Sequence, residues 1–78
     1  MSNFKIYAET EHLLFRRVGD FREGKRDRYR YVISVLTREA KMKIEQLAPG
    51  TFAGSAYSIS FSRYKRAVSK FQWLLLML

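Results

Sequence analysis

A set of apolar residues between Tyr57 and Leu78 recurs at intervals of three and four, and it constrains the fold more than any other stretch. Side chains at this spacing return to one face of an α-helix. A chain of 78 residues is near the size at which one core is only marginally sufficient, so we expect the core to be built on this stripe. The stripe consists of Tyr57, Phe61, Tyr64, Val68, Phe71, Leu75 and Leu78.

The start of the same segment carries a second pattern. Residues 57–62 read Tyr-Ser-Ile-Ser-Phe-Ser, an alternation that is typical of a β-strand. Serine disfavours a helix only mildly, and the helical spacing runs through these residues. The sequence therefore favours a helix throughout and leaves a strand over residues 57–62 as the alternative.

A second helical stripe is predicted from Tyr29 to Leu47, with Pro49 and Gly50 ending the helix. The competing interpretation rests on residues 31–36, which are rich in β-branched and aromatic residues and suit a strand. Thr37 would then cap a shorter helix that begins at residue 38. Periodicity over the longer stretch favours the long helix.

The N-terminal part of the chain predicts a β-hairpin. Residues 3–9 and 12–18 form its strands, and residues 10–11 form its turn. A polar connection over residues 19–27 follows, in which Asp27 is placed to cap the next helix. Because a two-stranded hairpin is not stable alone, it must place apolar side chains against the helices. Those side chains are Phe4, Ile6, Leu13 and Phe15.

These elements predict a single small α+β domain over residues 1–78. Two amphipathic helices joined by a short loop should lie antiparallel, with the N-terminal β-hairpin packed on them, in the order ββαα. If residues 30–36 and 57–62 are strands instead, the order becomes βββαβα, which is still an α+β fold.

Composition limits the functions that the chain can perform. There is no cysteine and only one histidine, so a thiol nucleophile, a histidine pair and a thiolate metal site are excluded. His12 is expected to be a hairpin residue, and no cofactor is expected. The N-terminus does not resemble a signal peptide, and the longest apolar run, residues 73–78, is far below the roughly 20 residues of a transmembrane helix. A cytoplasmic protein is the expectation.

The net charge of +8 is the most informative number in the composition, since fifteen Lys and Arg oppose seven Asp and Glu. Such a charge favours polyanions: nucleic acid, an anionic membrane surface or an acidic protein surface. Arginine dominates the first basic segment, and its planar fork suits phosphate; Phe21, Tyr29 and Tyr31 lie among these arginines as potential stacking platforms. The second basic segment lies in a region without any acidic residue after Pro49. The residues predicted to bind nucleic acid or a partner are Arg16, Arg17, Arg22, Lys25, Arg26, Arg28 and Arg30 in the first segment, and Arg63, Lys65, Arg66 and Lys70 in the second.

The C-terminal helix is predicted to be apolar nearly all round at its end. Trp73, Leu74 and Leu76 fall off the main stripe, so they are expected to form a protein interface. A homodimer through this helix and docking on another protein are both open at this point.

Together these features predict a non-enzymatic basic protein that engages nucleic acid or a nucleoprotein complex through the arginine-rich connection and the basic C-terminal helix. The alternative is a small inhibitor of the kind that phages and plasmids direct against host defence or transcription complexes, in the manner of an anti-CRISPR protein. A small ribonuclease that uses Arg, Lys and Tyr is the remaining enzymatic alternative.

Overall fold

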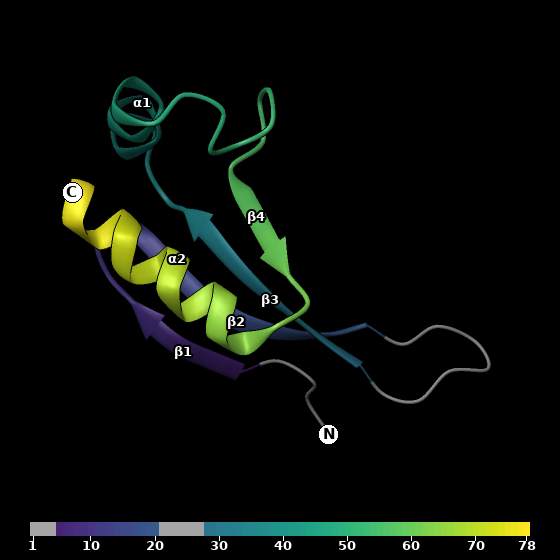
Figure 1. Cartoon of the computed structure of the whole chain (residues 1–78). Coiled ribbons are helices and arrows are strands. Elements are labelled where there is room, and N and C mark those ends of the chain that lie inside the picture. Colours follow the sequence, from purple (N-terminus) through teal and green to yellow (C-terminus); the bar gives the residue numbers. More distant parts are fainter. Residues whose placement is uncertain (1–4, 21–27) are drawn as a thin grey trace.

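A four-stranded antiparallel sheet carries a long helix across one face, and a shorter helix lies at one end of the sheet (Figure 1). The computed structural model describes residues 5–20 and 28–78. Its elements are β1 (Lys5–Glu9), β2 (Leu13–Asp20), β3 (Arg28–Val35), α1 (Arg38–Leu47), β4 (Ser58–Phe61) and α2 (Tyr64–Met77).

The strands lie in the order β1-β2-β3-β4, and each pairs antiparallel with its neighbour. The predicted α+β class is therefore confirmed. The predicted ββαα arrangement is wrong, because the elements follow the alternative order βββαβα. The predicted hairpin is present as β1 and β2, whereas the capping role of Asp27 concerns a residue outside the described ranges.

Residues 28–35 form a strand where the sequence favoured the beginning of a long helix. They pair with the whole length of β2, from Leu13 opposite Val35 to Asp20 opposite Arg28. A helix here would leave one edge of β2 without hydrogen-bond partners, and a two-stranded hairpin is at best marginal in water. Ile33 is fully buried and Val35 nearly so, which is the burial of alternate residues that a strand with one face on the core requires.

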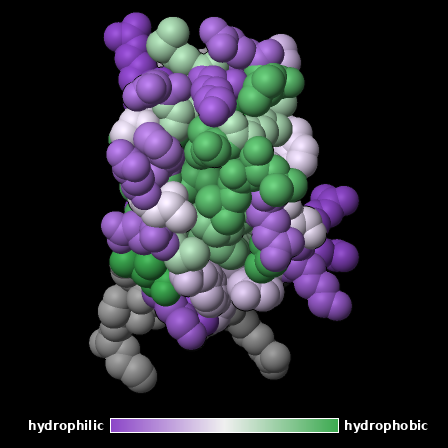
Figure 2. All heavy atoms as spheres, turned by 90° about the vertical axis from the view of Figure 1, so that its left-hand side faces the viewer, coloured by the Kyte–Doolittle hydropathy of each residue, from purple (hydrophilic) through white to green (hydrophobic). Residues whose placement is uncertain are grey.

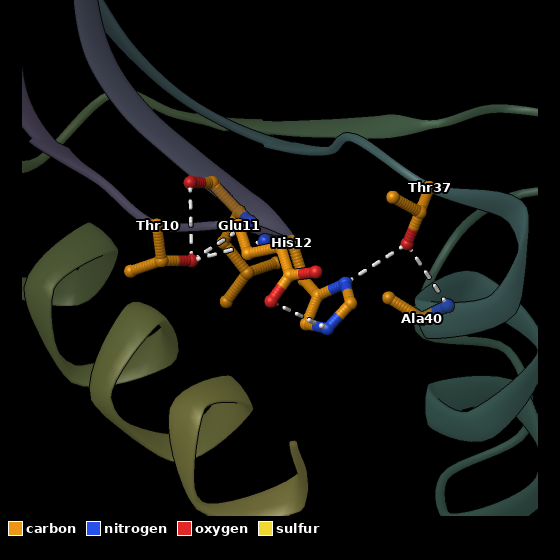
Figure 3. Close-up of polar contacts among 6 residues, drawn as sticks. Thr10, Glu11, His12, Thr37 and Ala40 are labelled. Carbon is orange, nitrogen blue, oxygen red and sulfur yellow. Dashed lines mark hydrogen bonds and ion pairs between the residues drawn. The ribbon is translucent and has the colours of Figure 1, made fainter.

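The shorter helix α1 begins where the competing interpretation placed it, directly after Thr37. The hydroxyl of Thr37 accepts a hydrogen bond from the amide of Ala40 at 3.2 Å, the contact of an N-cap residue. His12 Nδ1 lies 3.0 Å from the same hydroxyl oxygen, so the start of β2 is tied to the start of α1 (Figure 3). His12 thus has a structural role at the end of the hairpin turn, as predicted.

The connection between α1 and β4 contributes to the core through Phe52, of which only 2% is exposed. The Glu45 carboxylate holds this loop, because it accepts hydrogen bonds from the amides of Phe52 at 2.9 Å and Gly50 at 3.0 Å. These two bonds, the one from Phe52 first, lower the pKa of Glu45. Gly50 has a φ of 85°, a left-handed conformation that favours glycine just after a helix.

Residues 58–61 also form a strand, so the predicted helix from residue 57 is wrong in its first turns. β4 pairs with β3, which places Ile59 opposite Ile33 and Phe61 opposite Tyr31 on the face that carries α2. Tyr57 lies before the strand and is 43% exposed, with its ring 4.3 Å from Lys41 Nζ. The alternation with serine thus matches the observed strand, which is held by its pairing with β3.

The buried face of α2 differs by about one residue from the predicted stripe. Ala67, Phe71 and Leu74 are buried, whereas Leu75 is 39% exposed. The burial of Phe71 confirms one member of the stripe. Ala67 has only a methyl group and is fully buried, so the helix can approach the sheet closely along this face. Leu74 is therefore a core residue, and its predicted place in a protein interface is wrong.

A β-bulge in β1 changes which hairpin side chains face the helix. The register shifts between Ile6 and Ala8, and the ring of Tyr7 lies 5.1 Å from that of Phe15 on the α2 side. Ile6 consequently lies opposite Arg16 on the other face of the sheet and is 47% exposed. The prediction that Ile6 packs against the helices is therefore wrong. Phe4 lies outside the described residues.

Candidate nucleic-acid interface

The first basic segment does not form a single patch among the described residues. Arg16 and Arg30 lie on the face of the sheet turned away from α2, where the Nη2 of Arg30 donates to Ser60 Oγ at 3.2 Å. Arg17 lies on the opposite face, and Arg28 begins β3. The remaining predicted residues, Arg22, Lys25 and Arg26, lie outside the described ranges.

The tyrosines of β3 have different surroundings. Tyr29 is 37% exposed and lies under the guanidinium of Arg17, with 4.1 Å from Cζ to the ring centroid. Tyr31 is half-buried and belongs to an aromatic cluster, with ring centroids 5.6 Å from Tyr64 and 6.3 Å from Tyr7. Tyr31 therefore serves mainly to pack α2 on the sheet, and Tyr29 is the more accessible of the two rings.

The second basic segment lines an open groove between α2 and the edge strand β4. The groove is shallow and wide open to solvent, and it has a volume of about 510 Å³. Its walls combine cationic, hydroxyl and aromatic side chains. They are Phe61, Lys65, Arg66, Ser69, Lys70 and Trp73.

All the charged side chains that line this groove are cationic. No acidic side chain lines it, and the sequence contains none after residue 49. Lys65 and Arg66 lie in the first turn of α2, which follows the exposed Arg63 and has no acidic residue. A helix N-terminus carries partial positive charge, so cations there raise the local electrostatic free energy and an anion lowers it. The groove is therefore suited to anionic ligands.

Trp73 is the largest aromatic side chain of the groove. Its ring is 39% exposed, and Lys70 Nζ lies 3.9 Å from the ring centroid, which is the geometry of a cation–π contact. The sequence assigned Trp73 to an apolar interface and Lys70 to a basic face, but the structure brings both into one site. Lys70 and Trp73 lie three positions apart on one helix, so the sequence could have revealed their contact. The place of Phe61 in the groove could not be predicted in this way, because it depends on how β4 packs beside α2.

The apolar end of α2 divides into core and surface. Leu74 is fully buried, whereas Leu76 is 87% exposed. Figure 2 views the molecule from the side on which α2 ends and shows a band of hydrophobic surface with hydrophilic side chains around it. Exposed apolar surface of this kind marks sites that meet a partner.

The described residues contain no group of three or more His, Cys, Asp and Glu side chains that could hold a metal ion. His12 is engaged with Thr37 and lies 3.9 Å from the Glu11 carboxylate through its other nitrogen. Within residues 5–20 and 28–78, none of the helices is long and apolar enough to span a membrane.

Comparison of the chain with protein-family models, with curated proteins and with solved structures gives no match.

Proposed function

We propose that the protein binds nucleic acid without catalysis, through the groove between α2 and β4. The observation that supports this most is the composition of the groove: three cations and two aromatic rings line it, and no carboxylate does. Proteins that bind single-stranded nucleic acid combine a positively charged groove with aromatic side chains in this way. The net charge of +8 adds long-range attraction to any polyanion.

The cations of the groove are better placed for this role than those of the sheet. Lys65 and Arg66 are exposed on successive positions of one helix turn, and Lys70 follows one turn later. By contrast, Arg16 and Arg17 lie on opposite faces of β2, so their side chains leave the sheet on opposite sides. The arginine-rich first segment then contributes mainly to the general positive field.

We predict that Lys65→Ser/Arg66→Ser weakens binding of a fluorescent oligonucleotide, measured by anisotropy over a range of salt concentrations. Each lost phosphate contact should lower the slope of log affinity against log salt by about 0.7 for a single strand and about 0.9 for a duplex. Folding should be unaffected, because exposed charges of this kind contribute under about 1 kcal/mol.

The matched control is Arg38→Ser/Lys43→Ser on α1. It removes the same two side-chain types from exposed helical positions outside the groove. If both double variants lose affinity equally, attraction to the net charge explains binding and the groove is not the site. The proposal also fails if the parent binds no nucleic acid at low salt.

The exposed apolar surface at the end of α2 favours a second candidate, the small inhibitor that docks on a protein of a nucleoprotein complex. Leu76 at 87% exposure, beside the cations of the groove, would suit a partner with both an apolar and an acidic surface. Such a partner would be bound at salt concentrations that abolish contacts with naked nucleic acid, which separates the two candidates.

A further inference from the structure

We infer that the ligand of the α2–β4 groove is a single-stranded nucleic acid, with one base stacked on Trp73; this inference rests on the proposed function. The groove is not lined by cations alone: Phe61 and Trp73 supply aromatic surface, and Ser69 supplies a hydroxyl. Contacts with phosphates alone would need only the cations. The aromatic walls therefore indicate a ligand with an apolar, planar part.

Among the forms of nucleic acid, only one with an unpaired base presents an apolar, planar face to a surface groove. In a duplex each base is covered above and below by its neighbours, and a protein must pay an unstacking cost to expose it. In a single strand the base can turn away from the backbone at little cost and stack on an aromatic side chain. Stacking of this kind tolerates any sequence because every base has a π-face.

The arrangement along α2 suits a strand that lies along the helix. Lys65 and Arg66 lie at its N-terminal end and Trp73 about two turns later, which corresponds to about 10 Å along the helix axis. Lys70 Nζ lies over one face of the Trp73 ring, 3.9 Å from its centroid, so a base that stacks on this face would displace the ammonium, which could then contact a phosphate of the same strand. One end of the groove would thus hold backbone phosphates, and the other would hold a base together with its phosphate.

The test uses the fact that Trp73 is the only tryptophan of the chain. Titration with a deoxythymidine oligonucleotide should quench the intrinsic tryptophan fluorescence to saturation, because the stacked base contacts the indole directly. A duplex of the same length should bind more weakly and quench much less. Inorganic polyphosphate serves as a third probe that carries the charge without bases, and it should bind with little quenching.

Substitution separates stacking from charge. Trp73→Leu should lower the affinity for the oligonucleotide by about 5- to 150-fold, the range that corresponds to the loss of one base–aromatic stack. It should leave the affinity for polyphosphate unchanged, and Trp73→Phe should retain most of the oligonucleotide affinity. Circular dichroism should show the parental fold for both variants, since 39% of Trp73 is exposed.

The outcomes distinguish the inference of stacking on Trp73 from the proposed function of nucleic-acid binding. If duplex binds as tightly as the single strand, or if Trp73→Leu loses no oligonucleotide affinity while Lys65→Ser/Arg66→Ser does, stacking on Trp73 is wrong and the groove remains a phosphate site. If neither oligonucleotide nor duplex binds, the proposed function itself is wrong, and this inference falls with it.

Discussion

Leu74→Ala is expected to lower the free energy of unfolding by about 2–5 kcal/mol, whereas Leu76→Ala should change it by less than about 0.5 kcal/mol. The two leucines lie two positions apart in the same helix, and the same atoms are removed from each. Leu74 is fully buried in the core and Leu76 is 87% exposed, so the difference between the variants reports burial alone. Urea denaturation followed by circular dichroism measures both values.

The thermal consequence is large for a chain of this size. A change of 1 kcal/mol shifts the melting temperature of a domain of 60–100 residues by roughly 4–8 °C, so Leu74→Ala should melt at least about 8 °C below the parent. Equal melting temperatures for Leu74→Ala and Leu76→Ala would contradict the packing of α2 described above. A loss well above about 0.5 kcal/mol for Leu76→Ala would show that this leucine is covered in solution.

Phe52→Ala is expected to cost about 3–5 kcal/mol, although Phe52 lies in a loop. Its ring is almost completely buried, and the substitution would leave a cavity beside α1 and the sheet. Small domains have total stabilities of the order of 5–15 kcal/mol, so this variant can be largely unfolded at room temperature. The measurement is again urea denaturation, with the fraction folded in buffer as a second readout.

Phe52→Leu is the control, because leucine keeps most of the apolar volume and should cost about 1–2 kcal/mol. A loss below about 1 kcal/mol for Phe52→Ala would show that the connection between α1 and β4 can move away from the core. The hydrogen bonds from the amides of Gly50 and Phe52 to Glu45 would then not fix the loop in solution.

The strands β3 and β4 are the elements that the sequence alone did not predict as its favoured structure. Both segments carry a pattern that fits a helix over a long window and a strand over a short one, and the long window predicts a helix for each. What decides between them is pairing: β3 supplies partners to β2, and β4 supplies partners to β3. Those contacts join residues far apart in the chain, so periodicity within one segment could not reveal them.

Patterns of neighbouring residues did predict the hairpin and the helix cap, which depend on residues close together in the chain. Alternation in the first strand and the apolar residues after the turn predict the hairpin of β1 and β2, and the residue type and position of Thr37 predict it as the alternative cap. The inward turn of Tyr7 could not be predicted, because a β-bulge changes the facing of a side chain without any strong residue signature.

The candidate groove was predictable only in part. The basic residues of α2 were identified from the charge pattern, and Trp73 was identified as exposed apolar surface. Their union in one groove depends on α2 beginning at Tyr64 and on Phe61 ending the adjacent strand. Leu74 was misplaced because the predicted stripe was rotated by about one residue from the face that meets the sheet.

Mapping of the binding surface by nuclear magnetic resonance tests the central claim most directly. A chain of 78 residues gives one backbone amide signal for nearly every residue and a single indole signal, that of Trp73. During titration with a deoxythymidine oligonucleotide, the amides of Lys65, Arg66 and Ser69 and the indole of Trp73 should shift most. The signals of Arg38 and Lys43 on α1 should remain in place. Shifts concentrated on the sheet face that carries Arg16 and Arg30, with the groove unchanged, would contradict the assignment of the groove as the nucleic-acid site.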